Sequence, residues 1–599
     1  MKACYPLFYL AVILLSMGVR ANDGYSIFLI GGGLKFCSSQ DIAYCQKPLA
    51  LKSKYLVDFS YLVTDENLNG IDAAPWLPHR ADIKRQVLSA LQQVSNTTKG
   101  ELSRRQFTNA FRKTELMEAN KKRSGAELLR ELQVKEHQML MDWLQQPAMD
   151  TGFLRLDRRK SVKVQVANSK SLFSVRVVKA FIQQASGLTN KEKPKIVVIT
   201  AGRTDAFAEV DFYRQIFEQM GAEFVWLPVD AALMYAQLEN IGSKDNPYCR
   251  HLEVYRQQEL GRFQRHTIYP DLAEYQLQFC QKPKRLLTEL AEAQGLFIAD
   301  GDPALIRRAL IYNEGQDSQL LKGIRARAGS GKLVVAADGG GARALTTGGD
   351  GTGVMLIAGR SHQALSHGSF AGKQDLQGCE KQASCPPNYV THGGVYEPGG
   401  GLGLFHLGIV DTQFSELARQ GRLIRLLADT PVRFGFGIDE RTALLVQTGD
   451  LAEGQRMEVL GENGVSIYDS LEVQKSSSFR REIRSIRYHL ITQGDKALFN
   501  SNKLVISFAD WKFSSNKMTR PVIQSGNAFR KDNFRRIVNM LCSTGAQNAT
   551  LKHSVVGMGH VIYVQKSRTS ISLFGRLNIN GENYGYCSFR DFYLDVKAI

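Results

Sequence analysis

The chain has 599 residues, too many for a single hydrophobic core, so two or more structural units are expected. Its composition, 43% hydrophobic and 22% charged, is that of an ordinary folded protein and excludes a disordered or fibrous chain. The formal net charge of +18 suits acidic partners, but the basic residues are scattered and no nucleic-acid-binding signature accompanies them, so nucleic-acid binding is not expected.

Residues 1–21 have the layout of a secretory signal peptide. Lys2 precedes an apolar run near Leu7–Leu15, and cleavage is expected after Ala21. A retained membrane anchor is the alternative, but the run is short for a span and no later stretch is apolar enough to cross a bilayer. We therefore expect an exported protein, periplasmic or extracellular, with no membrane span.

Cysteine usage agrees with export. Of nine cysteines, Cys4 falls in the signal, and the even number that remains favours disulfides in an oxidising compartment. No short C-x-x-C spacing of a zinc site occurs, so no metal is expected. Composition leaves the pairing open, but the order along the chain suggests neighbours: Cys37 with Cys45, Cys249 with Cys280, Cys379 with Cys385, and Cys542 with Cys587.

The first part of the mature chain combines a strand with a helical block. Tyr25–Ile30 is a β-prone run ending in Gly31-Gly32-Gly33, typical of a first strand followed by a tight turn. From Ala81 to Leu144 the apolar residues recur at helical spacing. We predict that 22–64 is the first strand and an irregular segment of an α/β domain, and that 65–165 is a helical insertion.

Strands alternate with helices in residues 166–503. Strands are predicted at Lys195–Thr200, Glu223–Leu227, Gly295–Ala299 and Leu333–Ala337, with helices between them. This alternation indicates a mostly parallel sheet covered on both faces, with ligands beyond the carboxyl ends of the strands. Residues 361–400 are interpreted as a glycine- and serine-rich loop, and 504–599 as a β-rich C-terminal extension.

The strand Leu333–Ala337 runs into Asp338-Gly339-Gly340-Gly341 and then a helix expected from about Ala342. A strand, tight turn and helix is where an α/β hydrolase presents its nucleophile beside backbone N–H groups that stabilise an oxyanion. This turn lacks serine, cysteine and threonine. Gly339–Ala344 also fits a dinucleotide-binding fingerprint, but the acidic residue expected further on is missing, so no cofactor is expected.

Several segments together resemble the cyanophycinase family of serine peptidases, which is related to the aspartyl dipeptidases. The matching pieces, in chain order, are Ile30–Gly33, Val198–Gly202, Phe297–Asp302, Val334–Ala342, Gly401–Leu404, Asp411–Ser415, Gly421–Leu423, Gly437–Leu444 and Tyr488–Asp495. The resemblance covers about residues 25–34 and 195–503. It implies a three-layer α/β sandwich with a mostly parallel sheet, like the class I glutamine amidotransferases.

The catalytic positions depart from the family pattern. The family's serine nucleophile falls on Gly339, and its histidine base falls on Gln413. Glycine has no side chain to attack a carbonyl, and glutamine does not exchange a proton near neutral pH. The resemblance therefore implies that no catalytic residue is intact, with Asp338 as a possible surrogate nucleophile or base. A helix cap is the alternative role for Asp338.

Two further departures concern the surroundings of the turn. The family's Gly-Gly-Asp-Gln turn, which helps to form the oxyanion hole, reads Asp300-Gly301-Asp302-Pro303. The supporting acid expected within about twenty residues after the turn falls only on Asp350. Ser361, Ser366 and Ser369 lie near His362 and His367, but loop composition explains them better than a rescued catalytic set.

The binding frame of the family is retained at Gly301, Gly340, Arg419, Arg422 and Glu440. Because cyanophycin is a poly-aspartate carrying arginine on its side-chain carboxyls, the resemblance implies a peptide or an acidic, β-linked polymer as the ligand. Solvated surface arginines are the alternative. Two functions are considered: a catalytically degenerate peptide- or polymer-binding protein, and an active hydrolase of cyanophycin-like or β-aspartyl peptides with a substituted catalytic set.

Overall fold

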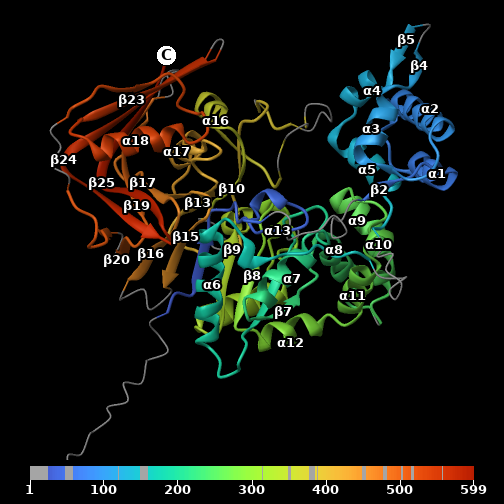
Figure 1. Cartoon of the computed structure of the whole chain (residues 1–599), viewed down its shortest axis with the longest axis horizontal. Helices are drawn as coiled ribbons and strands as arrows, with labels where there is room; N and C mark the ends of the chain where they lie inside the picture. The colour runs from blue at the N-terminus through green and yellow to red at the C-terminus, as the bar shows by residue number, and fades with distance from the viewer. Residues whose placement is uncertain are drawn as a thin grey trace, which may run out of the picture.

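A computed structural model of the chain is shown in Figure 1. It describes residues 24–47, 59–118, 121–148, 159–243, 245–312, 315–347, 353–374, 376, 379, 385–387, 389–447, 454–475, 482–500, 503–514, 519–555 and 558–599. The predicted signal peptide and Asp350 lie outside these residues. Within them, no helix has the length and apolar character needed to cross a membrane.

A nine-stranded sheet forms the centre of the fold. In spatial order its strands are β21 (Lys503–Ser507), β20 (Lys496–Asn500), β16 (Gln455–Gly461), β15 (Thr442–Gln447), β1 (Ile27–Ile30), β9 (Val334–Asp338), β8 (Gly295–Ile298), β6 (Lys195–Ile199) and β7 (Glu223–Trp226). From β1 to β7 the strands are parallel, and from β1 to β21 they are antiparallel. The predicted α/β class is confirmed, although the sheet is mixed because half of its pairings are antiparallel.

Alternate residues of the central strands enter two separate hydrophobic clusters, so both faces of this sheet are buried. Phe28 and Ile30 pack with α6 (Leu172–Ser186) and α7 (Val210–Gln219), whereas Ile27 and Leu29 belong to the cluster on the other face. The helices contributing to that second cluster include α8 (Ala231–Glu239), α9 (Leu252–Leu260), α11 (Pro270–Gln281), α12 (Lys284–Glu292), α13 (Pro303–Arg308) and α14 (Gln319–Gly329).

The helical block near the N-terminus has a core of its own, separate from the central sheet (Figure 1). Its elements are β2 (Ser60–Tyr61), α1 (Asp65–Ala73), α2 (Ala81–Thr97), β3 (Leu102–Ser103), α3 (Arg104–Arg112), β4 (Glu115–Glu118), β5 (Lys121–Ser124), α4 (Gly125–Glu131) and α5 (Val134–Leu144). Buried Asp142 of α5 joins this block to the remainder of the chain by accepting hydrogen bonds from Arg262 and Phe263. Arg262 and Phe263 directly precede the short helix α10 (Arg265–Ile268).

Residues 361–400, interpreted as a loop, contain regular structure instead. They form α16 (Ser361–His367), β11 (Ser369–Ala371) and β12 (Gly394–Glu397), and β12 lies between β11 and β10 (Met355–Ala358) in a three-stranded sheet. Apolar Leu365 and Val395 are fully buried here, which explains why the segment folds despite its many glycines and serines.

The C-terminal residues complete a second large sheet rather than standing alone. Its strands are β13 (Ile409–Thr412), β14 (Phe434–Ile438), β17 (Gly464–Asp469), β18 (Gln474–Lys475), β19 (Ile483–Thr492), β22 (Ile523–Ser525), β23 (Asn548–Val555), β24 (Met558–Ile579) and β25 (Glu582–Ala598). Helices α17 (Gln420–Asp429) and α18 (Asn533–Ser543) pack on it in a common hydrophobic cluster (Figure 1). The extension is therefore continuous with strands that border the candidate site.

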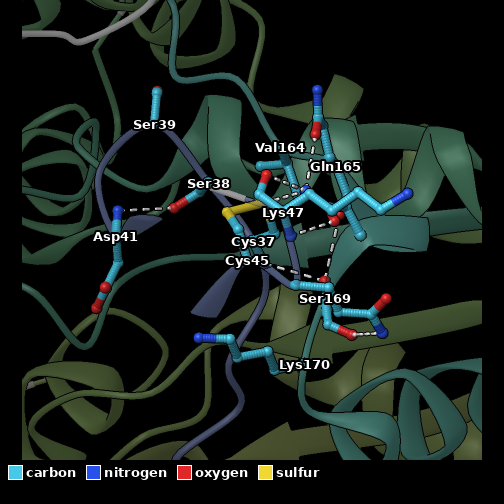
Figure 2. The surroundings of a disulfide bond; sticks show 12 residues. Cys37, Ser38, Ser39, Asp41, Cys45, Lys47, Val164, Gln165, Ser169 and Lys170 are labelled. Carbon is cyan, nitrogen blue, oxygen red and sulfur yellow. Dashed lines mark hydrogen bonds between the residues drawn. A yellow bond between two sulfur atoms is a disulfide. The ribbon is translucent and has the colours of Figure 1, made fainter. Parts of the chain in front are cut away.

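All four predicted disulfides are confirmed. The bond between Cys37 and Cys45 closes a short loop after β1 (Figure 2). This loop is held to the segment before α6, because the N–H of Cys37 donates to Ser169 Oγ at 3.0 Å and the N–H of Gln165 donates to the Cys37 carbonyl at 2.9 Å. The disulfide-closed loop thereby holds the chain after β1 next to the segment that leads into α6.

Candidate functional site

The turn after β9 has the geometry expected of a nucleophile-bearing turn. β9 ends at Asp338, and helix α15 (Gly340–Ala344) begins two residues later, slightly earlier than predicted. Gly339 lies between them with φ 50° and ψ −114°, a conformation that residues with a side chain rarely adopt. Because β9 is paired on both sides, by β1 and β8, this turn lies inside the sheet, one strand from the point at β1 where the pairing changes from parallel to antiparallel.

The carboxylate of Asp300 occupies the space directly beside Gly339. The N–H groups of Gly301 and Gly340 both donate to Oδ1 of Asp300, at 2.7 Å each. A Cβ atom placed on Gly339 would overlap this carboxylate. Gly339 has no side chain, and the Asp300 side chain from the neighbouring loop occupies the space where one would lie.

Gln413, the residue at the expected position of the base, lies on the other side of the turn. It follows β13, and its N–H donates to the carbonyl of Gly31 at 2.7 Å. A Cβ placed on Gly32 would be 3.0 Å from Gln413 Cγ and 3.4 Å from Gly339 Cα. The structure therefore brings the two predicted positions, Gly339 and Gln413, together around Gly32.

Asp338, the predicted surrogate, is a buried carboxyl with only 3% of its surface exposed. Burial, followed by the nearby carboxylates of Asp300 and Glu209, raises its pKa well above the ordinary value, and the N–H groups of Gly32 and Gly339 act in the opposite direction. Oδ1 of Asp338 is buried with no hydrogen-bond partner among the described residues, so this carboxyl is not presented to a ligand.

A polar pocket of about 390 Å³ lies next to the turn, at the carboxyl end of β8. It is lined by Gly301, Asp302, Pro303, Arg343, Ile357, Ala358, Gly359, Arg360, His392, Arg419 and Arg422. The predicted binding residues Gly301, Arg419 and Arg422 therefore meet in one place. Arg343, Arg360 and His392 were not among the predicted binding residues, because only the fold brings their separate segments to this pocket.

The charges around this pocket favour an anion. Four guanidinium groups line it, whereas three acids act on them: Asp302 in the lining, and Asp300 and Asp411 beside it. Burial and then the neighbouring Arg422 lower the pKa of both Arg419 and Arg343, as expected for crowded cations. A ligand carboxylate would relieve this crowding.

The arginines of the pocket are held in different ways. Arg422 is bound by Asp411, while Nη1 of Arg343 donates to the carbonyl of Ile357 at 2.5 Å. Nε of Arg343 is buried with no hydrogen-bond partner among the described residues. The Arg360 side chain is exposed at the pocket edge, where it can reach a bound ligand.

The remaining predicted residues lie elsewhere. Glu440 pairs with Arg441 at 2.9 Å beside the turn after β1, outside the arginine-lined pocket. Gly340 contacts the Asp300 loop and not the pocket. Ser361 joins two helices, since its Oγ donates to the Ala418 carbonyl and accepts from the N–H of Gly421, which is a structural role. Among the described residues, no group of histidines, cysteines or acids is arranged to hold a metal ion.

These features define an α/β protein with a glycine at a sharp strand-to-helix turn and an arginine-lined pocket beside it. A segment of the chain is similar to cyanophycinases: it is 32% identical over 102 residues to those of Trichormus variabilis and Nostoc sp., and 29% identical over 102 residues to that of Geminocystis herdmanii. The matches cover 16% of this chain and 33–36% of each relative, so the chain spans about a third of the length of the curated relatives it matches.

No protein-family model matches the chain. The crystal structure of a peptidase from an acI-B1 Actinobacterium aligns with 54% of this chain and 91% of that chain, at 18% identity and a TM-score of 0.31.

Proposed function

We propose that this protein is an exported, catalytically degenerate relative of the cyanophycinases that binds a peptide or an acidic, β-linked polymer. The similarity to cyanophycinases over 102 residues supports the relationship, and the sheet buried on both faces agrees with a class I glutamine amidotransferase-like sandwich. The four disulfides agree with export to an oxidising compartment.

The observation that carries the binding proposal is the arginine-lined pocket beside the turn. Its guanidinium groups outnumber the carboxylates that neutralise them, and arginine binds carboxylates with paired, directional hydrogen bonds. A volume of about 390 Å³ is enough for one or two residues of an acidic peptide. In this proposal Arg360 and Arg419 contact the ligand, and Arg422 supports them from behind.

The proposed loss of catalysis rests on the turn itself. Gly339 offers no nucleophile, and Gln413 offers no base. An active hydrolase would need a surrogate such as Asp338, but that carboxyl is buried and does not line the pocket. This arrangement favours binding over hydrolysis.

The proposal is tested by isothermal titration calorimetry with the dipeptide β-aspartyl-arginine, followed by mass spectrometry of the recovered ligand. We expect binding, with the dipeptide recovered intact. Arg360→Gln should weaken binding roughly tenfold, the usual effect of losing one charged hydrogen bond. The matched control is Arg105→Gln, which changes an exposed arginine of α3 and should leave binding unchanged. Release of free arginine, or no binding at all, would contradict the proposal.

A further inference from the structure

We propose that Asp300 is a built-in blocking group, whose carboxylate occupies the place where a peptidase of this design would hold the oxyanion of its substrate. This inference rests on the proposed function, because it takes the turn at Gly339 as a degenerate nucleophile turn. It adds a second obstacle to catalysis that is separate from the missing serine.

Two backbone N–H groups are the donors at this place. An oxyanion hole in an α/β hydrolase uses the N–H of the residue after the nucleophile together with an N–H from a neighbouring loop. Here the residue after the turn position is Gly340, and the neighbouring loop supplies Gly301. Both N–H groups donate to one oxygen of Asp300, at 2.7 Å. A carboxylate oxygen bears the negative charge that such donors bind.

Close backbone contacts fix the loop that carries Asp300. Asp302 N–H donates to the Gly202 carbonyl at 2.7 Å, which ties the loop to the end of β6. A Cβ on Gly301 would overlap the backbone of Gly202, and one on Gly340 would overlap the carbonyl of Gly301. Glycine at these positions lets three backbone segments approach closely, so the Asp300 side chain has a fixed place.

A side chain at position 339 would compete with Asp300 for the same space. Because a Cβ at this position would overlap the Asp300 carboxylate, a side chain there and the seated carboxylate exclude each other. A serine introduced at the turn would have to displace Asp300 and break its two hydrogen bonds. Asp300 therefore determines whether the site can accept a nucleophile and an oxyanion.

The coupling is tested by thermal unfolding of single and double variants. Gly339→Ala should lower the apparent Tm by roughly 2–4 °C or more, and by less when Asp300→Ala is also present, because the overlap is then removed and only the strain of a side chain at φ 50° remains. Gly408→Ala is the matched control: its overlap is with the backbone of Phe434 and does not involve Asp300, so its effect should be the same with and without Asp300→Ala. An equal effect of Gly339→Ala in both backgrounds would overturn the proposal.

A second measurement tests the consequence for chemistry. The variant Gly339→Ser/Gln413→His, with and without Asp300→Ala, is treated with a fluorophosphonate probe, which forms an oxygen–phosphorus bond to an activated serine and releases fluoride. We expect labelling to be faster by on the order of 10- to 100-fold when Asp300 is replaced, since the probe's P=O oxygen needs the two free N–H groups. Equal labelling of the two variants, whether both react or neither does, would overturn the proposal.

These tests are independent of the ligand. Neither the unfolding cycle nor the probe needs the peptide to bind, so failure of the β-aspartyl-arginine titration would leave them interpretable. Conversely, if the protein binds the dipeptide but Asp300 and Gly339 show no coupling, the proposed function stands and the role given to Asp300 is wrong.

Discussion

Arg422 and Asp411 form a buried, bidentate ion pair behind the arginine-lined pocket. Nε of Arg422 donates to Oδ2 of Asp411 at 2.8 Å, and Nη2 donates to Oδ1 at 2.6 Å. Burial alone would raise the pKa of Asp411, but Arg422 reverses this and the pKa is lowered. Asp411 is the second-last residue of β13, which ends at Thr412 directly before Gln413, so this pair fixes the strand end that reaches the turn.

Removing Arg422 should therefore destabilise the protein more than it changes ligand contacts. Arg422→Ala removes the bidentate partner of a fully buried carboxylate and leaves it only the longer contact with Arg419 at 3.6 Å, which costs about 3–5 kcal/mol. Arg425→Ala in the same helix breaks a partly exposed pair with Asp429 and should cost about 1 kcal/mol or less. Thermal and denaturant unfolding of both variants would measure this, and equal losses would show that the Arg422–Asp411 pair is not structural.

Glu416 should make stability depend on pH. Burial and then the carboxylate of Asp439 raise its pKa to about 7, although Arg535 of α18 donates to both acids. The folded state then keeps a proton that the unfolded state loses from its ordinary value of 4.5 upward. This contribution is complete below about pH 4.5 and is lost as the pH rises through 7, by up to about 3 kcal/mol.

The measurement is the Tm between pH 4.5 and 8 for wild type and Glu416→Gln. The wild-type Tm should fall more steeply with rising pH, because the variant carries no titrating group at this position. Glu472→Gln, at an exposed site, serves as the control and should follow the wild type. Parallel curves for wild type and Glu416→Gln would refute the raised pKa.

The disulfides should differ in their contribution to stability according to the loops that they close. Cys249 and Cys280 are 31 residues apart, whereas Cys37 and Cys45 are 8 apart. Loop-closure entropy then predicts losses of about 4 and about 2.5 kcal/mol when each pair is replaced by alanine. Unfolding of the two double variants would check this order, and a larger loss for the shorter loop would contradict it.

Asp142 should control how the helical block is attached. Its carboxylate is fully buried and accepts from Arg262 at 2.8 and 2.9 Å, with Arg265 at 3.3 Å. Asp142→Ala removes one of the two carboxylates that pair with these arginines and leaves only Asp205, and we expect cleavage of residues 59–148 by thermolysin to accelerate about tenfold or more. Asp82→Ala, at an exposed pair in the same block, should not change the rate. No acceleration in Asp142→Ala would show that this contact does not hold the block.

Much of the fold followed from local sequence patterns. The apolar runs at β6, β8 and β9, each ending in a turn, were predicted as strands of one sheet because buried parallel strands are uniformly apolar. The disulfide pairs were confirmed since each joins neighbours in the sequence. Residues 361–400 were misinterpreted, because their glycines and serines hid the few buried apolar residues that form α16 and β12.

The site was less predictable because it depends on tertiary contacts. The sequence placed Gly339 in a turn and marked Asp300 as a departure from a glycine, but only the fold shows that its carboxylate reaches the N–H of Gly340. In the same way, Arg343 and Arg360 join Arg419 only because α15, the end of β10 and the start of α17 meet at one pocket. Residues 40 or more positions apart in sequence carry no local signal of such proximity.

The most direct test of the account is a crystal structure of the wild-type protein after incubation with β-aspartyl-arginine. The account predicts an intact dipeptide with a carboxylate against Arg360 and Arg419, and the Asp300 carboxylate still bound by the N–H groups of Gly301 and Gly340. A cleaved dipeptide, or a ligand oxygen in place of the Asp300 carboxylate on those N–H groups, would contradict it.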